Sequence, residues 1–494
     1  MLRNTVFFIS LLSRIFISHG VCINHFDVYD ECANPFPSGC CVFGSAFICN
    51  GVNVTDANDF ADEIPQTSSD LFIANTNKSF INDGDWKFLY NLSYLQELSF
   101  NNHKISNLGN LKSVYLKDLV QLKLLSLSVG NLRKFPVEQF TNLMSLRYLD
   151  LSCNKLQSIG EERWNFSLLN DLILSNNRLT AVRAEQLKGL GTLSTLDLSY
   201  NRISYFSAKV LESMPNLKYL HLSFNRLLHV SDHSQRHTKL IFWGISSNLF
   251  VSLEPSIFHD FKSLHTIDYT KNSIKDPPRV YSKNNETSAV VLSLQFNVIE
   301  ILSPLFFDHF PHLNGINVAN NRIRQIEENA FRSVPNVTVI SLSDNKINTI
   351  PIQLFQHLKN IEILNVQFNR IQILHPQFLL SLNTDVQLFI YGNPILCDCQ
   401  AVPLLKWLIL SATPPSTFPS CQSPEELQNQ SIYDSKLPED CHYSTSIPAS
   451  TEITPTSYRN PLNRDVTFML IIGSLIVVLI CIFSKIFCPA CKAS

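Results

Sequence analysis

Charged side chains are scarce in this chain of 494 residues, since Asp, Glu, Lys and Arg make up 16% and the formal net charge is −2. A protein that attracts nucleic acid through its surface field carries a basic excess, so the composition argues against that class. Glycine is also sparse, with 14 residues. Cysteine is nearly missing from the middle of the chain, because all but one of the 13 cysteines lie towards the two ends. This distribution suggests end modules held by disulfides and an oxidising compartment.

Two apolar segments predict the topology. Residues 1–20 begin with basic Arg3, continue through a short apolar stretch and end in small residues before Val21, as a secretory signal peptide does. An N-terminal anchor is the alternative, but the stretch is too short to span a bilayer. Residues 466–484 are long enough to do so. We therefore expect a single-pass type I protein of the plasma membrane, with residues 485–494 as its cytoplasmic tail.

Between these segments one pattern recurs, Leu-x-x-Leu-x-Leu-x-x-Asn-x-Leu. It is cleanest from Leu146 to Leu156 and returns every 23 to 25 residues as far as the copy that starts at Asp385. Two looser copies start at Leu95 and Leu122, and a doubtful one lies around Leu71. The apolar positions alternate as in a short strand, with one face inward. One such unit cannot bury its apolar face, whereas a stack of units buries a continuous core.

The Asn position of the motif predicts a ladder of side-chain hydrogen bonds. An amide has donors and an acceptor, so it can satisfy backbone groups that are freed where every coil turns. An apolar residue would leave those groups unpaired, at about 1–3 kcal/mol each. His103 and Gly130 replace Asn in the two looser copies, where we expect the ladder to be weakest. The other copies have Asn154, Asn177, Asn201, Asn225, Asn248, Asn272, Asn297, Asn321, Asn345, Asn369 and Asn393.

Residues 68–396 therefore resemble the leucine-rich-repeat family. The resemblance implies an α/β repeat solenoid, a curved horseshoe of about 13–14 coils with a parallel sheet on the concave side and irregular or short helical turns on the convex side. A second apolar set in each coil, such as Phe331 with Val334 or Phe355 with Leu358, is expected to close the coil from the convex side.

Residues 397–441 resemble the cysteine-rich C-terminal flank of the family, which caps the last coil. The disulfides that this resemblance implies are Cys397–Cys421 and Cys399–Cys441. A metal site is the alternative for a Cys-x-Cys pair, and the secretory context disfavours it. No metal and no cofactor is expected.

Residues 21–67 resemble the matching N-terminal flank but depart from it, because five cysteines stand where the usual module has four. By parity the fifth could pair with Cys153, several coils away, although disulfides need Cα atoms closer than about 7 Å. We expect instead a free thiol or a bridge between two molecules. The five cysteines are Cys22, Cys32, Cys40, Cys41 and Cys49.

Residues 442–465 are rich in Ser, Thr and Pro, as in an O-glycosylated stalk or a plain disordered linker. Beyond the expected membrane span, Cys488 and Cys491 are candidates for palmitoylation, with unmodified thiols as the alternative. A lipid-anchor signal is disfavoured because Lys485 and further polar residues follow the apolar run. The tail is too short for a Toll/interleukin-receptor domain or a kinase, so any signal would need a partner.

Seven Asn-x-Ser/Thr sequons support the secretory route, and none falls on a solvent-facing strand position of the motif. We expect their glycans to leave the concave face open. The sequon residues are Asn53, Asn77, Asn91, Asn165, Asn285, Asn336 and Asn429.

The third and fifth positions of each motif are expected to face solvent on the concave sheet. From the copy at Leu146 to the copy at Leu264 they combine aromatic rings, carboxylates and a histidine, as protein-binding hot spots do. Ordinary solvated residues are the alternative. The predicted ligand-binding residues are Tyr148, Asp150, Asp197, Tyr219, His221, Phe242 and Asp268.

Asp197 and His221 could be mistaken for an acid–base pair, but no nucleophile, oxyanion donor or enclosed pocket accompanies them, so we expect no enzyme activity. The sequence is similar to leucine-rich-repeat adhesion and guidance receptors, and to Toll-like ectodomains without a signalling domain. It predicts a cell-surface receptor or adhesion protein that recognises an extracellular protein ligand and has no nucleic-acid partner. The alternative is an accessory co-receptor or a homophilic structural subunit without its own signalling, and a dimer is compatible with either.

Overall fold

The computed structural model describes residues 40–43, 45–50, 57–74, 86–103, 105–108, 111–231, 239–253, 257–258, 261–277, 288–382, 385–411, 418–435 and 437. The predicted signal peptide, stalk, membrane span and tail lie outside these ranges. Within them, no helix combines the length and the apolar character needed to cross a bilayer. The chain divides into two compact units. Unit 1 is Met1–Ala289 with Phe296–Val298 and His309–Pro311, and unit 2 is Val290–Gln295, Ile299–Asp308 and His312–Ser494.

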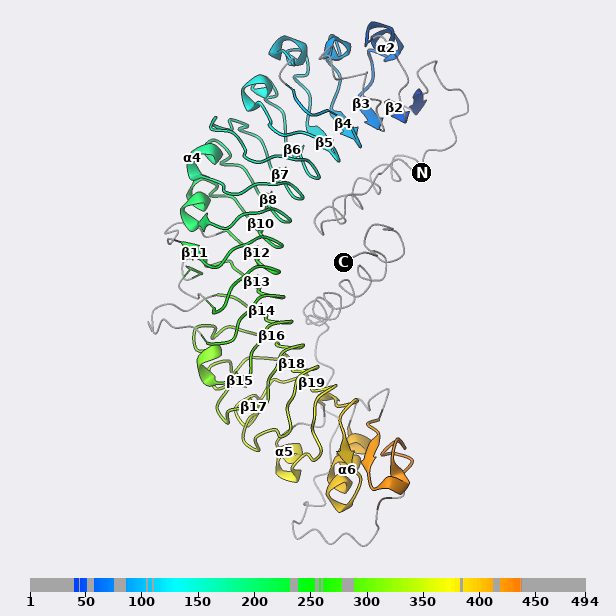
Figure 1. Ribbon diagram of the computed structural model, residues 1–494, viewed down its shortest axis with the longest axis vertical. Coiled ribbons are helices and arrows are strands. Elements are labelled where there is room, and N and C mark those ends of the chain that lie inside the picture. The colour runs from blue at the N-terminus through cyan, green and yellow to red at the C-terminus, as the bar shows by residue number, and fades with distance from the viewer. Residues whose placement is uncertain are drawn as a thin grey trace, which may run out of the picture. The chain divides into compact units, whose positions relative to one another are not determined.

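Unit 1 is built on a parallel sheet whose strands follow one another in chain order (Figure 1). An antiparallel hairpin of β1 and β2 starts it, and β2 pairs in parallel with β3. The strands are β1 (Cys40–Phe43), β2 (Ala46–Asn50), β3 (Asp70–Ala74), β4 (Glu97–Asn101), β5 (Leu124–Ser128), β6 (Tyr148–Asp150), β7 (Asp171–Ile173), β8 (Thr195–Asp197), β10 (Tyr219–His221), β12 (Phe242–Gly244) and β13 (Thr266–Asp268).

The return segments of unit 1 carry short helical turns on the side away from the sheet (Figure 1). Two short strands, β9 (Phe206–Ser207) and β11 (Val230–Ser231), pair in parallel there. The helical turns are α2 (Ala57–Glu63), η1 (Trp86–Leu89), η2 (Ser113–Leu116), η3 (Val137–Phe140), α4 (Ala184–Leu187) and η4 (Ala208–Ser213).

Unit 2 repeats the same plan with a parallel sheet of β14 (Val291–Ser293), β16 (Gly315–Asn317), β18 (Val339–Ser341), β19 (Ile363–Asn365) and β20 (Gln387–Phe389). Its return segments hold β15 (Ile301–Leu302), η6 (Pro304–Phe306), β17 (Gln325–Ile326) and α5 (Pro376–Ser381). The C-terminal end adds β21 (Ile395–Leu396), η7 (Cys399–Ala401), α6 (Val402–Leu410), β22 (Cys421–Ser423) and η8 (Glu425–Leu427).

The strands lie where the motif predicts them. From β6 onward each main-sheet strand of either unit covers the third to fifth motif positions, and the fourth position, such as Leu149, is buried. The doubtful copy around Leu71 is a true coil, because β3 pairs with β4 in register. Alternation along three residues is enough to give each coil one inward face.

The second apolar set closes the coils from the other side. In unit 2 the rings of Phe307, Phe331 and Phe355 stack from coil to coil, with centroids 5.5 and 5.9 Å apart. Phe355 also contacts Phe378, at 5.6 Å. All four side chains are buried, so the prediction for Phe331 and Phe355 is confirmed.

The predicted asparagine ladder is present, and Asn201 shows its pattern. Its Oδ1 accepts a hydrogen bond from the Leu179 backbone N at 2.9 Å in the preceding coil. Its Nδ2 donates to the carbonyl of Leu174 in the preceding coil and to that of Leu198 in its own, both at 3.0 Å. Each buried Asn therefore joins two coils and satisfies backbone groups that no strand partner reaches.

The residue before each ladder position has a positive φ, which the motif did not reveal. In twelve coils it is not glycine, and φ lies between 50° and 55°. Asn and Asp tolerate this left-handed region, but bulky Tyr200 and Phe224 rarely adopt it. The coil-to-coil hydrogen bonds thus hold Tyr200 and Phe224 in a left-handed backbone conformation that such bulky residues rarely adopt.

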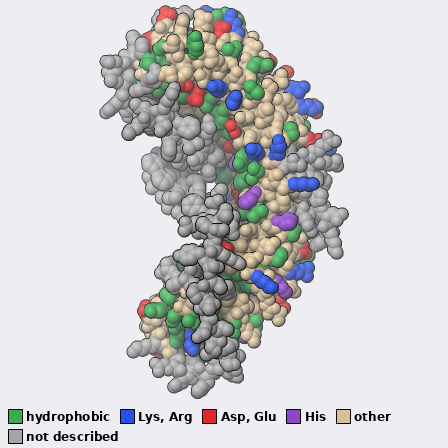
Figure 2. All heavy atoms as spheres, turned by 180° about the vertical axis from the view of Figure 1, so that it is seen from behind, with side chains coloured by type: hydrophobic (Ala, Val, Ile, Leu, Met, Phe, Trp, Pro, Cys, Tyr) green, Lys and Arg blue, Asp and Glu red, His purple; other side chains and the backbone are tan. Residues whose placement is uncertain are grey.

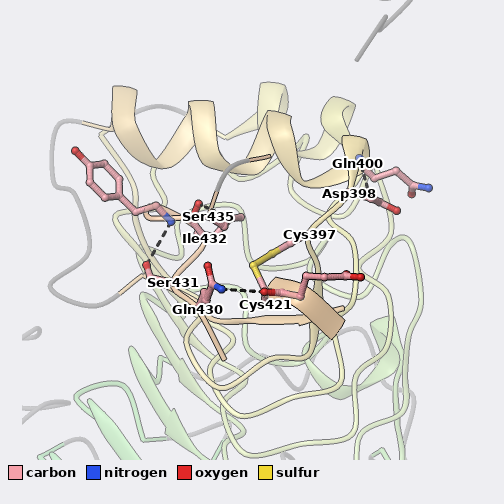
Figure 3. Close-up of a disulfide and its surroundings, with 10 residues drawn as sticks. Cys397, Asp398, Gln400, Cys421, Gln430, Ser431, Ile432 and Ser435 are labelled. Atoms are coloured by element: carbon pink, nitrogen blue, oxygen red, sulfur yellow. Dashed lines mark hydrogen bonds between the residues drawn. A yellow bond between two sulfur atoms is a disulfide. The ribbon is translucent and has the colours of Figure 1, made fainter. Parts of the chain in front are cut away.

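Disulfides close both ends. Cys40 pairs with Cys49 across the first hairpin, and Cys397 pairs with Cys421 as predicted (Figure 3). The latter bond lies beneath α6, beside the backbone hydrogen bond from the Cys421 N to the Gln430 O at 2.8 Å. Cys397 is therefore not a metal ligand.

Three further cysteines, Cys41, Cys153 and Cys399, also take part in disulfides. Cys441 lies outside the described residues, so its pairing with Cys399 stays a prediction; Cys22 and Cys32 lie outside them too. Cys153 is disulfide-bonded although its distance from the N-terminal module in the sequence argued against such a bond.

Candidate functional site

The predicted binding residues lie in two rows across the sheet of unit 1. The third motif positions align as Tyr148, Asp171, Thr195, Tyr219, Phe242 and Thr266. The fifth positions align as Asp150, Ile173, Asp197, His221, Gly244 and Asp268. The register therefore brings Asp197, Tyr219, His221 and Phe242 together on three adjacent strands, and leaves Tyr148 and Asp150 farther along the sheet.

Asp150 and Asp197 are not solvent-facing, which corrects the sequence prediction. Their exposed fractions are 3% and 1%. The Asp150 Oδ1 accepts a hydrogen bond from the Ser152 backbone N at 2.8 Å. The Asp197 Oδ1 accepts from the Ser199 backbone N at 2.9 Å and from the Ser199 Oγ at 2.6 Å. An Asp that bonds the backbone two residues on stabilises a turn, so these carboxylates hold the end of each strand.

Asp268 uses the same geometry, with its Oδ1 2.9 Å from the Thr270 N, although its side chain is only half-buried. Burial raises the pKa of Asp150, Asp197 and Asp268 above the ordinary range, while hydrogen bonds to the neighbouring Ser or Thr oppose the rise. The charge of His221 also opposes the rise in the pKa of Asp197 and Asp268. Placing these carboxylates at the turns therefore costs desolvation of their charged form.

The accessible part of the site is an aromatic cluster formed by Tyr219, His221 and Phe242. Tyr219 is 41% exposed and lies opposite Phe242 on the next strand. The rings of His221 and Phe242 are 5.1 Å apart between centroids. Large rings bordered by polar groups supply contact area with little loss of side-chain freedom, so this cluster suits recognition of another protein surface.

Gly244 completes the cluster, and sequence analysis missed it. A Cβ at Gly244 would lie 2.8 Å from Cε1 of Phe242, so the ring of Phe242 covers the space that a side chain would occupy. Glycine within a strand often marks such a close approach, and that signal was present in the sequence.

The described sequon residues Asn91, Asn165, Asn336 and Asn429 are exposed and lie outside every strand of the two sheets. The other three sequons, at Asn53, Asn77 and Asn285, lie outside the described residues.

Figure 2 shows hydrophobic side chains exposed among basic ones on the face that it presents.

Family models match the repeats. Residues 167–227, 287–347 and 335–395 match the leucine rich repeat, and residues 145–166 match a second model of the same repeat. No curated protein matches the chain in sequence.

Solved structures share the fold. A leucine-rich-repeat protein of Leptospira interrogans is similar at 22% identity and a TM-score of 0.53, over 72% of this chain and 91% of that one. A chain of the Drosophila Toll–Spatzle complex is similar at 16% identity and a TM-score of 0.55, over 79% and 63%. A chain of the mouse RP105/MD-1 complex is similar at 22% and 0.51, over 74% and 58%. The chain thus spans about three-fifths of the latter two, and at these identities the likeness shows the fold alone.

Proposed function

From the premise that this is a leucine-rich-repeat protein, we propose that it is a cell-surface receptor or adhesion protein that binds an extracellular protein through the sheet of unit 1. Residues 1–20 would direct it to the secretory route, and residues 466–484 would anchor it in the plasma membrane. Residues 397–441 would cap the last repeat, and residues 442–465 would link this cap to the membrane anchor.

The observation that carries the proposal is the aromatic cluster of Tyr219, His221 and Phe242. Its rings lie on adjacent strands that are held by the asparagine ladder and by buried carboxylates, so the backbone that presents the cluster is formed before a partner arrives. A preformed surface loses less side-chain entropy on binding than a mobile one. The Toll–Spatzle and RP105/MD-1 structures are complexes, which is compatible with this use of the fold.

The experiment is a screen of secreted and cell-surface proteins against cells that display the full chain. Each hit is measured again on Tyr219→Ala cells and on Tyr94→Ala cells, since Tyr94 is also exposed but lies outside the sheet. We expect Tyr219→Ala to weaken binding by about tenfold or more, as loss of a hot-spot tyrosine does, and Tyr94→Ala to change it little. Hits that respond equally to both variants would contradict the proposal.

An accessory or homophilic subunit is the second candidate. Aggregation of cells that display the chain, without any added protein, would select this candidate.

A further inference from the structure

A second surface of unit 1 lies at the edge of the sheet where the strands end and the asparagine ladder begins. Across six successive coils this edge consists of residues 152–158, 175–181, 199–205, 223–229, 246–252 and 270–276, here called the edge segments. They hold six basic residues and a single acid, Asp276. The basic residues are Lys155, Arg178, Arg202, Arg226, Lys271 and Lys275.

Large apolar side chains are exposed in the middle of this edge. Leu228 is 56% exposed, Leu249 is 47% exposed and Val251 is 54% exposed. Tyr205 and Phe224 are also exposed within the edge segments, and these five residues are here called the edge patch. Exposed apolar groups scattered singly are normal, but a group gathered on consecutive coils marks an interaction surface.

Backbone hydrogen bonds hold the coils of the edge patch next to one another. The Leu249 N donates to the Leu227 O at 2.8 Å, which sets Leu249 beside Leu228. The Arg226 N donates to the Ile203 O at 2.8 Å, and the Lys275 N donates to the Val251 O at 3.2 Å. Arg226 is exposed in the same segment as Leu228, and Lys275 is exposed on the next coil beside Val251, so basic side chains accompany the apolar centre.

An aromatic pair lies on the same edge. The rings of Tyr200 and Phe224 stack with centroids 4.0 Å apart and planes 11° from parallel, and both residues have positive φ. Lys271 lies over the ring of Phe296, with its Nζ 5.6 Å from the centroid. Tyr, Phe and Arg are the residue types that protein interfaces concentrate, whereas Lys and Glu are depleted at their centres.

We propose that the edge patch and its basic border form a docking surface, separate from the sheet face, for a different protein whose contact surface has an apolar centre and an acidic rim. Charge complementarity decides the partner. A second copy of this chain would bring the same basic border against itself in a two-fold arrangement, and like charges would oppose it. No sequon falls in the edge segments, so a glycan attached to this chain would not start within the surface.

The test pans a random peptide library displayed on phage against the full chain held in nanodiscs. We expect the enriched peptides to combine Asp or Glu with Leu, Phe, Tyr or Trp. Their affinity should fall by about tenfold or more for the Arg202→Glu/Arg226→Glu variant and less than about threefold for Arg202→Lys/Arg226→Lys, which keeps the charges. Val251→Ser should weaken binding, and Val120→Ser, with the same exposed fraction of 54%, should not.

Each alternative result overturns the proposal. Peptides without acids, or peptides that bind the double Glu variant equally well, would remove the charge argument. Sensitivity to the arginines without sensitivity to Val251 would reduce the surface to general attraction of anions. Self-association of the full chain that is lost in Leu249→Arg would assign the edge to a second copy. Tyr219→Ala should leave peptide binding unchanged, so failure here and failure of the sheet-face proposal are distinguishable.

Discussion

The ring of His103 occupies the space that a side chain at Gly130 would need, so the two departures from asparagine in the ladder compensate for each other. A Cβ at Gly130 would lie 2.0 Å from Cε1 of His103. The His103 Nε2 lies 3.1 Å from the Leu127 O, the carbonyl that Asn154 Nδ2 also contacts at 2.6 Å. A carbonyl only accepts, so Nε2 carries the proton and donates. The ladder is altered at these two coils, but it continues through them.

Gly130→Ala should destabilise unit 1 by about 1–3 kcal/mol, because the added methyl group forces the buried His103 ring to move. Denaturant unfolding measures the change. Gly191→Ala is the matched control, since a Cβ there meets nothing within 4 Å. If His103 is the obstacle, the double variant His103→Ala/Gly130→Ala loses less stability than the two single variants together. Additive losses would contradict this relationship.

Acidification should weaken the fold through the same histidine. Burial lowers the pKa of His103 from 6.5 to about 4, and its hydrogen bond to Leu127 opposes the change. The unfolded chain then gains a proton near pH 6.5 while the folded chain does not until about pH 4, so stability falls as the pH drops through that window. The shift in pKa corresponds to a loss of about 3 kcal/mol in the free energy of unfolding.

His103→Gln isolates this effect, because the variant keeps a donor but does not titrate. The carboxylates of Asp150, Asp197 and Asp268 act in the opposite direction, since their raised pKa makes protonation favour the folded state. The unfolding free energies of wild type and His103→Gln are therefore measured at pH 7 and at pH 4.5. The loss between the two pH values is then compared between the two proteins. An equal pH dependence in both proteins would show that His103 is not the cause.

Asn201→Ala should cost about 2 kcal/mol or more, because buried backbone groups of two coils lose their partners at once. Asn142→Ala, at an exposed turn, should change the unfolding free energy by less than about 0.5 kcal/mol. Thermal unfolding of both variants gives the comparison. Equal melting temperatures would refute a stabilising ladder.

Asp197→Asn should be at least as stable as wild type at pH 7, whereas Asp197→Ala should lose about 1–3 kcal/mol. Unit 2 supplies the precedent, because Asn317 Oδ1 accepts from the Ala319 N at 3.1 Å and Asn365 Oδ1 from the Gln367 N at 3.0 Å. An amide thus holds the turn without a buried charge. Equal loss in both variants, measured by denaturant unfolding, would show that the charge itself is required.

The repeat could be predicted from the sequence to the residue, since the position of each strand follows from alternation and from the buried leucines. The roles of the fifth motif positions could not. Alternation predicts that the side chain of Asp197 faces solvent. In the structure its carboxylate accepts a hydrogen bond from the Ser199 N of the turn that follows, and it is buried. Whether an Asp faces solvent or bonds the backbone two residues on depends on the local φ and ψ, which alternation does not contain.

The backbone conformation at the exposed edge could not be predicted from the sequence either. A positive φ at Tyr200 and Phe224 follows from the coil-to-coil hydrogen bonds and contradicts the local preference of both residues. In the same way, the fit of His103 over Gly130 depends on two residues 27 positions apart, and each alone reads as a defect in the ladder.

A glycan placed on the sheet face tests the central claim most directly. His221→Asn creates the sequon Asn-Leu-Ser with Leu222 and Ser223, and His221→Asn/Ser223→Ala removes the sequon again. Both variants are displayed on cells, the glycan is verified by its mobility shift, and the affinity for a protein recovered in the screen is measured. The account predicts that the glycosylated variant loses binding well beyond the reduction that the variant without the sequon shows from loss of the His221 ring. Unchanged affinity of the glycosylated variant would contradict recognition through the sheet of unit 1.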